Sequence, residues 1–454
     1  MDTLRFPSSL IPPPAGQLTP EPNAEAIRPP LQATPAVRST QAAWDVLLVC
    51  VAGYILMAVG RLHQLFPVLQ TLRPALVFGL LAVVLYLIDG RQSRQLHRLW
   101  VPTTICLVGL LAWIALGIPG AIVQGNSYAL LTQNFIKTVL MYMVIAGSVR
   151  GTRDIERLAF FYYLSAVIYA GVILTRFDIG SGNAWRLGDL YYYDANDFAT
   201  FAVSAMPLGL FFAHAARRTT TKVFAVFALI ILAVVLVRSG SRGGFLAVLA
   251  VGGFVVLRYS AIAVRWRVGS FVLVAFVFTA VASGQYWRQM GTIVSDTDYN
   301  QTEESGRLQI WSRGIGYMFS NPVFGVGADN FATAEGTLSP LARRQQFGRG
   351  VRWNAAHNSL VQVGAELGLP GLLFFVAMVA TALAALAGSK RQRRRHPAFR
   401  GRPLELRQAL MASLIGFAVG AFFLSLAYHE MLYTLLAFAV GMGKVSDAAS
   451  RSSH

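Results

Sequence analysis

The sequence predicts an all-α polytopic membrane protein with about twelve transmembrane helices. Of its 454 residues, 55% are hydrophobic and only 13% are charged, a composition that does not suit a water-soluble globule. Apolar runs near 20 residues recur along the chain, and a helix of that length crosses ~30 Å of hydrocarbon. Backbone amides in lipid must bond within their own segment, so we expect the spans to be helices.

The apolar runs divide the chain into five parts. We expect a disordered, proline-rich cytoplasmic tail without a cleaved signal peptide (1–43), nine spans (44–283), a periplasmic loop with an amphipathic helix (284–358), three spans (359–443) and a second cytoplasmic tail (444–454). The expected spans are 44–60, 74–88, 99–118, 128–148, 158–175, 198–215, 223–237, 245–257, 268–283, 360–387, 409–426 and 431–442.

The orientation of the chain in the membrane explains how the basic residues behind its formal charge of +18 are distributed. With the N-terminus in the cytoplasm, 25 Lys and Arg residues fall in inside segments and 13 in outside segments. The short loops alternate as the positive-inside rule requires, so the basic excess does not imply a nucleic-acid partner. The basic block at 390–396 is typical of a cytoplasmic anchor beside anionic membrane lipid.

Metal and redox chemistry find little support in the sequence. The two cysteines, Cys50 and Cys106, lie inside apolar runs, and no Cys/His spacing is typical of a metal site. Asp296 and Asp298 form an acidic pair of the kind that can bind a metal diphosphate. A solvated acidic patch is the more common arrangement, because hard metals need several converging oxygens. We therefore expect no metal and no cofactor.

Several outward arginines lie close to the ends of expected spans, where the positive-inside rule does not explain their charge. Arg242 lies in Ser-Arg-Gly-Gly (241–244), where glycines could leave the backbone bare for a phosphate at the start of the next helix. Arg307 opens a segment with helical periodicity, and Arg186 lies in an earlier outward loop. The alternative for any one of them is contact with the phosphates of bulk lipid.

The segment after Arg307 predicts an amphipathic helix (306–319) that rests on the membrane surface. Its apolar residues recur at spacings of three and four, which places them on one face. They are Leu308, Trp311, Ile315 and Phe319.

His357 stands at the start of the tenth expected span. A helix N-terminus disfavours the imidazolium, so this histidine should be neutral and able to act as a base. Asn358, Gln362 and Glu366 form a polar stripe that should face the bundle interior and support the site. Glu366 lies about 13 Å along the helix from His357, too far to orient the imidazole directly. A single interfacial histidine can also be a passive headgroup contact.

Three segments together resemble the O-antigen ligase and polymerase superfamily. They are Ser-Arg-Gly-Gly at 241–244, the run from Arg307 to Phe331 containing N-P-V-F-G-V-G-A-D-N-F, and A-H-N-S-L-V-Q-V-G-A-E-L-G-L-P-G at 356–371. The expected topology, with one large outward loop between late spans, is also similar.

The resemblance implies a metal-independent, inverting glycosyltransferase of the bacterial inner membrane with its active site facing the periplasm. The donor would be a glycan linked to undecaprenyl diphosphate and the acceptor lipid A–core oligosaccharide. By the same resemblance, His357 takes the position of the family's catalytic histidine. Arg242 and Arg307 take the positions of its essential arginines, and Arg186 falls near a further one.

Several alternatives remain open on the sequence. An O-antigen polymerase or a protein O-oligosaccharyltransferase would use the same donor with a different acceptor. A secondary transporter could use Lys137 and Glu366 as charges within the membrane. His429, in the turn before the last expected span, either lines the site or caps a helix.

Overall fold

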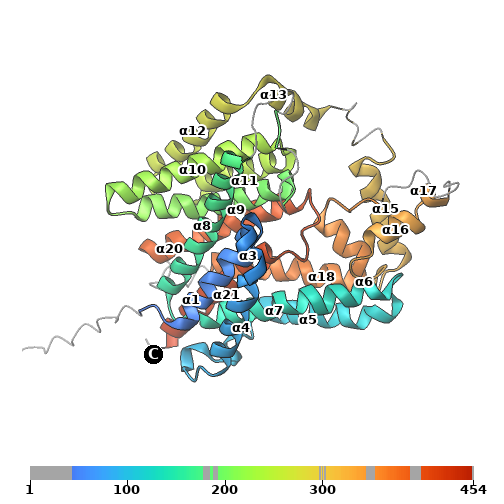
Figure 1. Cartoon of the computed structure of the whole chain (residues 1–454), viewed down its shortest axis with the longest axis horizontal. Coiled ribbons are helices and arrows are strands. Elements are labelled where there is room, and N and C mark those ends of the chain that lie inside the picture. Colours follow the sequence, from blue (N-terminus) through green and yellow to red (C-terminus); the bar gives the residue numbers. More distant parts are fainter. Residues whose placement is uncertain are drawn as a thin grey trace, which may run out of the picture. The chain divides into compact units, whose positions relative to one another are not determined.

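The computed structural model describes residues 43–176, 185–187, 193–295, 298, 300, 303–343, 353–388 and 400–451. Within these ranges every regular element is a helix (Figure 1). The N-terminal tail before residue 43 and the basic block at 390–396 lie outside the described residues, as do the insert arginines Arg344, Arg349 and Arg352.

The first half of the bundle contains helices α1 to α12. They are α1 (Val46–Tyr54), α2 (Leu62–Leu65), α3 (Pro67–Leu72), α4 (Pro74–Leu87), α5 (Pro102–Gly117), α6 (Gln124–Ala129), α7 (Ile136–Ser148), α8 (Thr152–Arg176), α9 (Ala195–Ala215), α10 (Thr219–Ser239), α11 (Arg242–Arg258) and α12 (Val264–Val281). Two π-helical turns extend α1 (Ile55–Val59) and join α6 to α7 (Leu130–Phe135).

The insert between the ninth and tenth expected spans and the last three spans follow. They are α13 (Gly284–Gly291), α15 (Arg307–Ser320), α16 (Phe331–Thr337), α17 (Pro340–Arg343), α18 (Ser359–Ala387), α20 (Gly401–Ala421) and α21 (Glu430–Arg451). The helix α21 is longer than expected. It continues past the predicted start of the tail at residue 444, because Lys444 is buried and donates to the carbonyl of Gly147 at 2.8 Å.

Nine helical segments of the described chain are long and apolar enough to cross a membrane, which confirms an all-α polytopic membrane protein. Each of the twelve expected ranges falls on helical structure. Three of the twelve expected spans are not among these nine helical segments, because they are shorter or more polar. They are α1 with its π-helical extension, α11 and α21.

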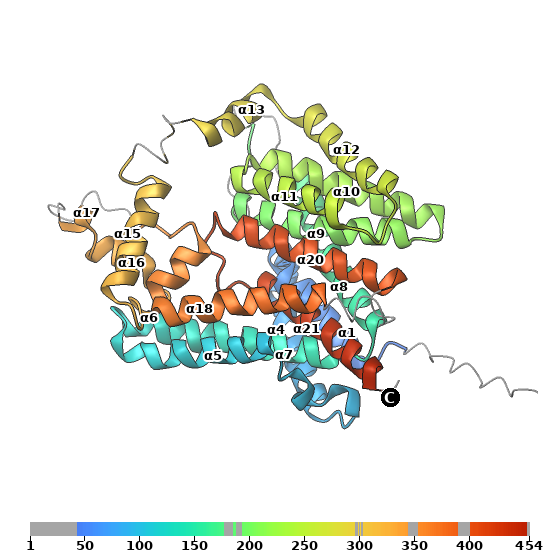
Figure 2. The ribbon, with the colours of Figure 1, turned by 180° about the vertical axis from the view of Figure 1, so that it is seen from behind.

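The helix α9 forms the centre of its half of the bundle, packed between α8, α10, α11 and α20 (Figures 1 and 2). Small residues allow this close approach. A Cβ added at Gly420 of α20 would lie 2.4 Å from the Thr200 hydroxyl oxygen on α9. A Cβ at Gly209 of α9 would lie 2.6 Å from Leu229 of α10. Close backbone approach at small residues is the usual basis of helix association in lipid.

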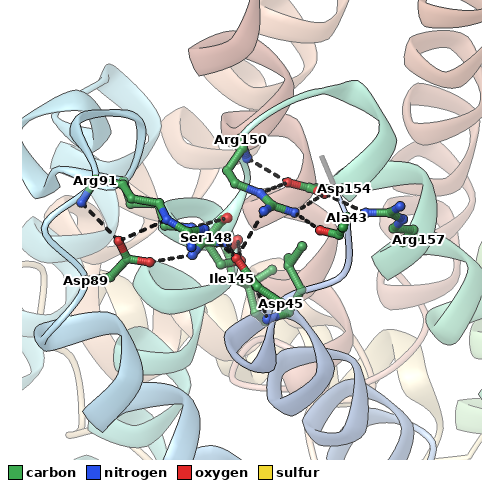
Figure 3. Close-up of polar contacts among 12 residues, drawn as sticks. Ala43, Asp45, Asp89, Arg91, Ile145, Ser148, Arg150, Asp154 and Arg157 are labelled. Atoms are coloured by element: carbon green, nitrogen blue, oxygen red, sulfur yellow. Dashed lines mark hydrogen bonds and ion pairs between the residues drawn. The ribbon is translucent and has the colours of Figure 1, made fainter. Parts of the chain in front are cut away.

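Three loops that the charge pattern assigns to the cytoplasm meet in one ionic network (Figure 3). Asp45 precedes α1 and contacts Arg91 at 2.6 Å, Arg94 at 2.7 Å and Arg150 at 3.1 Å. Arg150 also binds Asp154 at the start of α8, at 2.8 Å. The segments expected on one side of the membrane therefore lie together in the structure.

The tenth span is broken, and the insert docks into the break. Gly368 has φ 69, a left-handed conformation that interrupts α18 just before Pro370. The carbonyls of Ala365 and Glu366 accept from the amides of Val326 and Gly327, at 2.8 and 3.0 Å. The kink thus fixes the insert on the bundle, and Figure 2 shows α15 and α16 beside one end of α18.

The predicted amphipathic helix is present as α15, and its two faces differ. Ile310, Gly314 and Tyr317 are buried against the protein. Three residues of the predicted apolar stripe, Leu308, Ile315 and Phe319, are exposed and available to membrane lipid. The fourth, Trp311, is half-buried and packs against the protein, and the opposite face fixes the helix to α18.

Candidate active site

His357 lies where the insert returns to the membrane-spanning bundle. Its backbone is left-handed, with φ 46, and its amide donates to the Ser425 hydroxyl at 2.9 Å. The carbonyl of Ala356 accepts from the Trp311 indole at 3.0 Å. Asn358 is the N-cap of α18, so its side chain serves the helix rather than the imidazole. Contacts from two elements thus fix the half-buried His357.

The surroundings of His357 favour the neutral imidazole. Burial lowers the pKa of His357 below its usual value, the Arg307 guanidinium lowers this pKa further, and the Asp194 carboxylate acts in the opposite direction. A histidine with a lowered pKa is uncharged at neutral pH and can accept a proton. Asp194, which caps α9, was missed by the sequence reasoning, although Asp before an apolar run is a common N-cap signal.

Arg242 begins α11 and already binds a carboxylate of the insert. Its guanidinium donates to the Thr292 hydroxyl at 2.7 Å and to Asp298 at 2.9 Å. The expectation of a solvated acidic patch is therefore wrong for Asp298, whose side chain is only 7% exposed; Asp296 lies outside the described residues. Burial acts to raise the pKa of Asp298, but hydrogen bonds from Asn300 and the Arg242 charge hold this pKa below its usual value.

The glycines beside Arg242 serve helix packing, so the expected bare backbone is not present at them. Gly243 and Gly244 are both buried. A Cβ at Gly243 would lie 3.0 Å from Cβ of Phe423, and one at Gly244 would lie 2.9 Å from Ala199. The amide of Gly244 donates to Ser241, the N-cap of α11.

Arg186 is brought to the same turn as Arg242. Its Nε donates to the carbonyl of Ser239 at 2.7 Å, and its Nη2 donates to Asn196 at 3.2 Å. The neighbouring amide of Leu187 donates to the carbonyl of Arg238. Ser239 ends α10 and Arg242 begins α11, so the two arginines lie on either side of one tight turn.

Residues 422–426, between α20 and α21, contact three of the segments that carry the predicted site residues. Phe423 packs against Gly243 next to Arg242, while Ser425 binds the amide of His357. Phe422 packs against Trp311, with ring centroids 5.5 Å apart. Trp311 lies one helical turn after Arg307 on the same face of α15. This segment therefore contacts His357 directly and contacts the helices that begin with Arg242 and Arg307.

Glu366, one of the residues of the predicted polar stripe, is buried and hydrogen-bonded to two other segments. Its carboxylate accepts from the amide of Phe331 at 3.2 Å and from the Tyr428 hydroxyl at 2.8 Å. It therefore joins α18 to the insert and to the loop that continues from residues 422–426. Gln362, one turn earlier, is also buried.

Other polar candidates have structural roles. His429 accepts from the amide of Met431 at 3.2 Å, so it caps α21, the second of the two alternatives. Arg313 binds both carboxylate oxygens of Glu335 within the insert, at 2.9 and 3.1 Å from its Nε. Lys137 is exposed on α7 and is not among the hydrogen-bond partners of Glu366.

The described residues of the site include an imidazole and several guanidinium groups. No group of three or more His, Cys, Asp or Glu side chains in the described residues could hold a metal ion. A neutral imidazole near guanidinium groups can remove a proton from a hydroxyl and can stabilise a leaving anion. Such a site suits group transfer from a phosphorylated donor.

The fold and the site define a multi-pass membrane protein with a polar site where an insert meets the spanning helices. Residues 227–376 match the O-antigen ligase family model, which supports membership in the O-antigen ligase and polymerase superfamily and confirms the resemblance seen in the sequence. The match contains Arg242, Arg307 and His357 and leaves Arg186 outside. It points to glycosyl transfer of the ligase or polymerase type. A comparison with curated proteins finds no match for the chain.

Proposed function

We propose that this protein is an O-antigen ligase that acts at the periplasmic face of the bacterial inner membrane. It transfers a glycan from undecaprenyl diphosphate to a sugar hydroxyl of lipid A–core oligosaccharide. The observation that carries the proposal is the environment of His357, a half-buried imidazole with a lowered pKa beside Arg307. A sugar hydroxyl is a poor nucleophile, and a positioned base typically accelerates its reaction by ~10²–10⁴-fold.

The reaction is a single displacement with inversion. His357 takes the proton of the acceptor hydroxyl as its oxygen attacks the anomeric carbon of the donor sugar. The bond from that carbon to the diphosphate oxygen breaks, and the diphosphate leaves with the electron pair. Arg242, Arg307 and Arg186 bind the diphosphate and stabilise the charge that develops on it. Because the lipid diphosphate is already a good leaving group, the reaction needs no nucleotide hydrolysis.

The positions of the arginines in the structure support their proposed role in binding the diphosphate. Arg186 and Arg242 lie on either side of the α10–α11 turn, and Gly243 beside Arg242 contacts the segment that binds His357. A transporter would instead use Glu366 as a mobile charge within the membrane. Its carboxylate is occupied by Phe331 and Tyr428, which favours a supporting role.

The decisive experiment is transfer from purified undecaprenyl-diphosphate glycan to purified lipid A–core, without ATP and with chelator. We expect transfer by the wild type and loss of transfer in His357→Ala. Normal transfer by a folded His357→Ala protein would remove the base assignment. In cells, a null strain that accumulates core without any repeat supports a ligase, whereas core with a single repeat would indicate a polymerase.

A further inference from the structure

A cavity of about 210 Å³ lies between α9, α10, α11 and α12, and the candidate site does not use it. Its lining is almost wholly apolar and includes Pro207 of α9, Ile230 of α10, Val248 of α11 and Val274 of α12. An apolar lining of this kind suits a hydrocarbon rather than a sugar.

The cavity begins one helical turn from Arg242. Phe245, three residues after Arg242 on α11, lines its outer end together with Trp287 of α13. The lining continues along α11 to Val255. At 1.5 Å per residue this part of α11 is about 15 Å long, half the thickness of the hydrocarbon core. The cavity thus runs from the cationic site into the membrane.

The cavity is open to one side, since its lining residues Leu249, Phe271 and Trp287 are themselves exposed. Only Val277 and Phe278 of α12 are buried, while Val272 and Phe276 are exposed. Val272 and Val274 are two residues apart on α12 but lie in different surroundings. Val274 lines the cavity, whereas Val272 is exposed on the outer face of the helix. Lipid can reach the cavity past α12 without crossing the packed core around α9.

We propose that this cavity binds the polyprenyl tail of the donor, with its diphosphate at Arg242. The inference rests on the proposed function and adds a tail-binding groove to it. A polyprenyl diphosphate joins a compact anion directly to a linear run of apolar isoprene units. The structure matches this arrangement, because the guanidinium of Arg242 lies one helical turn before the start of the apolar groove. Binding energy from the tail would fix the anomeric carbon near His357.

The test compares two substitutions of the same type on α12. Val274→Trp narrows the groove, whereas Val272→Trp adds the same bulk on the exposed face. Each purified full-length variant is assayed with one glycan on two donors, undecaprenyl diphosphate and the short-chain geranyl diphosphate. We expect Val274→Trp to raise the KM for the long donor about tenfold, as overpacking an apolar site does. It should change the KM for the short donor little, and Val272→Trp should change neither.

The outcomes distinguish a failure of the groove hypothesis from a failure of the proposed function. If the wild type transfers glycan and Val274→Trp behaves like Val272→Trp, the groove holds only bulk membrane lipid and the inference is overturned. An equal loss with both donors also overturns it, because the damage would then lie in the chemistry. If the wild type uses neither donor, the proposed function itself fails. Val248→Phe fills the groove from α11 and replaces Val274→Trp if that variant does not accumulate.

Discussion

Asp298 of the insert holds the guanidinium of Arg242 at 2.9 Å, with both side chains largely buried. The pair joins the start of α11 to the segment that follows α13. It also places a carboxylate where the proposed function requires a diphosphate. A donor that binds Arg242 must therefore compete with Asp298 or bind on the remaining side of the guanidinium.

Asp298→Asn should lower the KM for the undecaprenyl-diphosphate donor. The substitution removes the competing negative charge and keeps the shape of the side chain, so we expect a decrease of roughly tenfold, in line with a charge-assisted hydrogen bond. Steady-state transfer assays with varied donor give the result. Glu303→Gln, which neutralises an exposed carboxylate of the same insert, is the control and should leave the KM unchanged. A higher KM in Asp298→Asn would instead show that the pair organises the site for the donor.

Arg307→Gln should shift the pH dependence of transfer. Burial and Arg307 lower the pKa of His357, so the wild type should lose kcat/KM only as pH falls below the usual histidine pKa of about 6.5. Removing the guanidinium raises the pKa of His357, and the acid limb of the residual activity should move to higher pH. Arg288→Gln makes the same charge change at an exposed position and is the control. Identical acid limbs in wild type and Arg307→Gln would contradict the electrostatic coupling.

Glu366→Ala should reduce kcat more than it raises the donor KM. The carboxylate joins Phe331 of the insert to Tyr428, and its loss frees the loop that carries Ser425 and therefore His357. A displacement of about 1 Å at a reacting group can cost ~10²-fold in rate. Glu366→Gln can accept from Phe331 and donate to Tyr428, so it should recover most of the lost kcat. Equal kcat in the alanine and glutamine variants would exclude the positioning role.

The sequence predicted the spans because apolar length is a strong local signal, and each range falls on helical structure. The break at Gly368 was not predicted, since hydropathy continues through it, although Gly and Pro370 were visible breakers. His357 was placed before a helix from the apolar span that follows it, and α18 does begin at Ser359; Asn358, expected in a polar stripe, is its N-cap. The pairing of Arg242 with Asp298 and of His357 with Ser425 depends on tertiary packing of distant segments, which no local pattern encodes.

Asp45→Asn should destabilise the protein, and the loss should depend on pH. The carboxylate of Asp45 contacts Arg91, Arg94 and Arg150, and it caps α1 through the amide of Leu48 at 3.0 Å. Asparagine retains the cap and loses the charge, so we expect a cost of roughly 1.5–3 kcal/mol at pH 7, the range for a hydrogen bond to a charged group. Asp45→Ala should cost about 1 kcal/mol more through loss of the cap.

The pH dependence of this loss follows from the pKa of Asp45. Burial acts to raise this pKa, but the Leu48 amide and the Arg94 guanidinium hold it below the usual value. The stabilisation is therefore fully present above the unfolded-state pKa of about 3.9 and is lost as pH falls through the lower folded-state pKa. Thermal unfolding of the purified protein at pH 7 and near pH 3 gives the measurement. The difference in Tm between wild type and Asp45→Asn should narrow at the lower pH, because Asp45 of the unfolded wild-type chain is then largely protonated and folding must remove that proton. A difference that stays constant would mean that packing, rather than charge, connects α1 to the loops around Arg94 and Arg150.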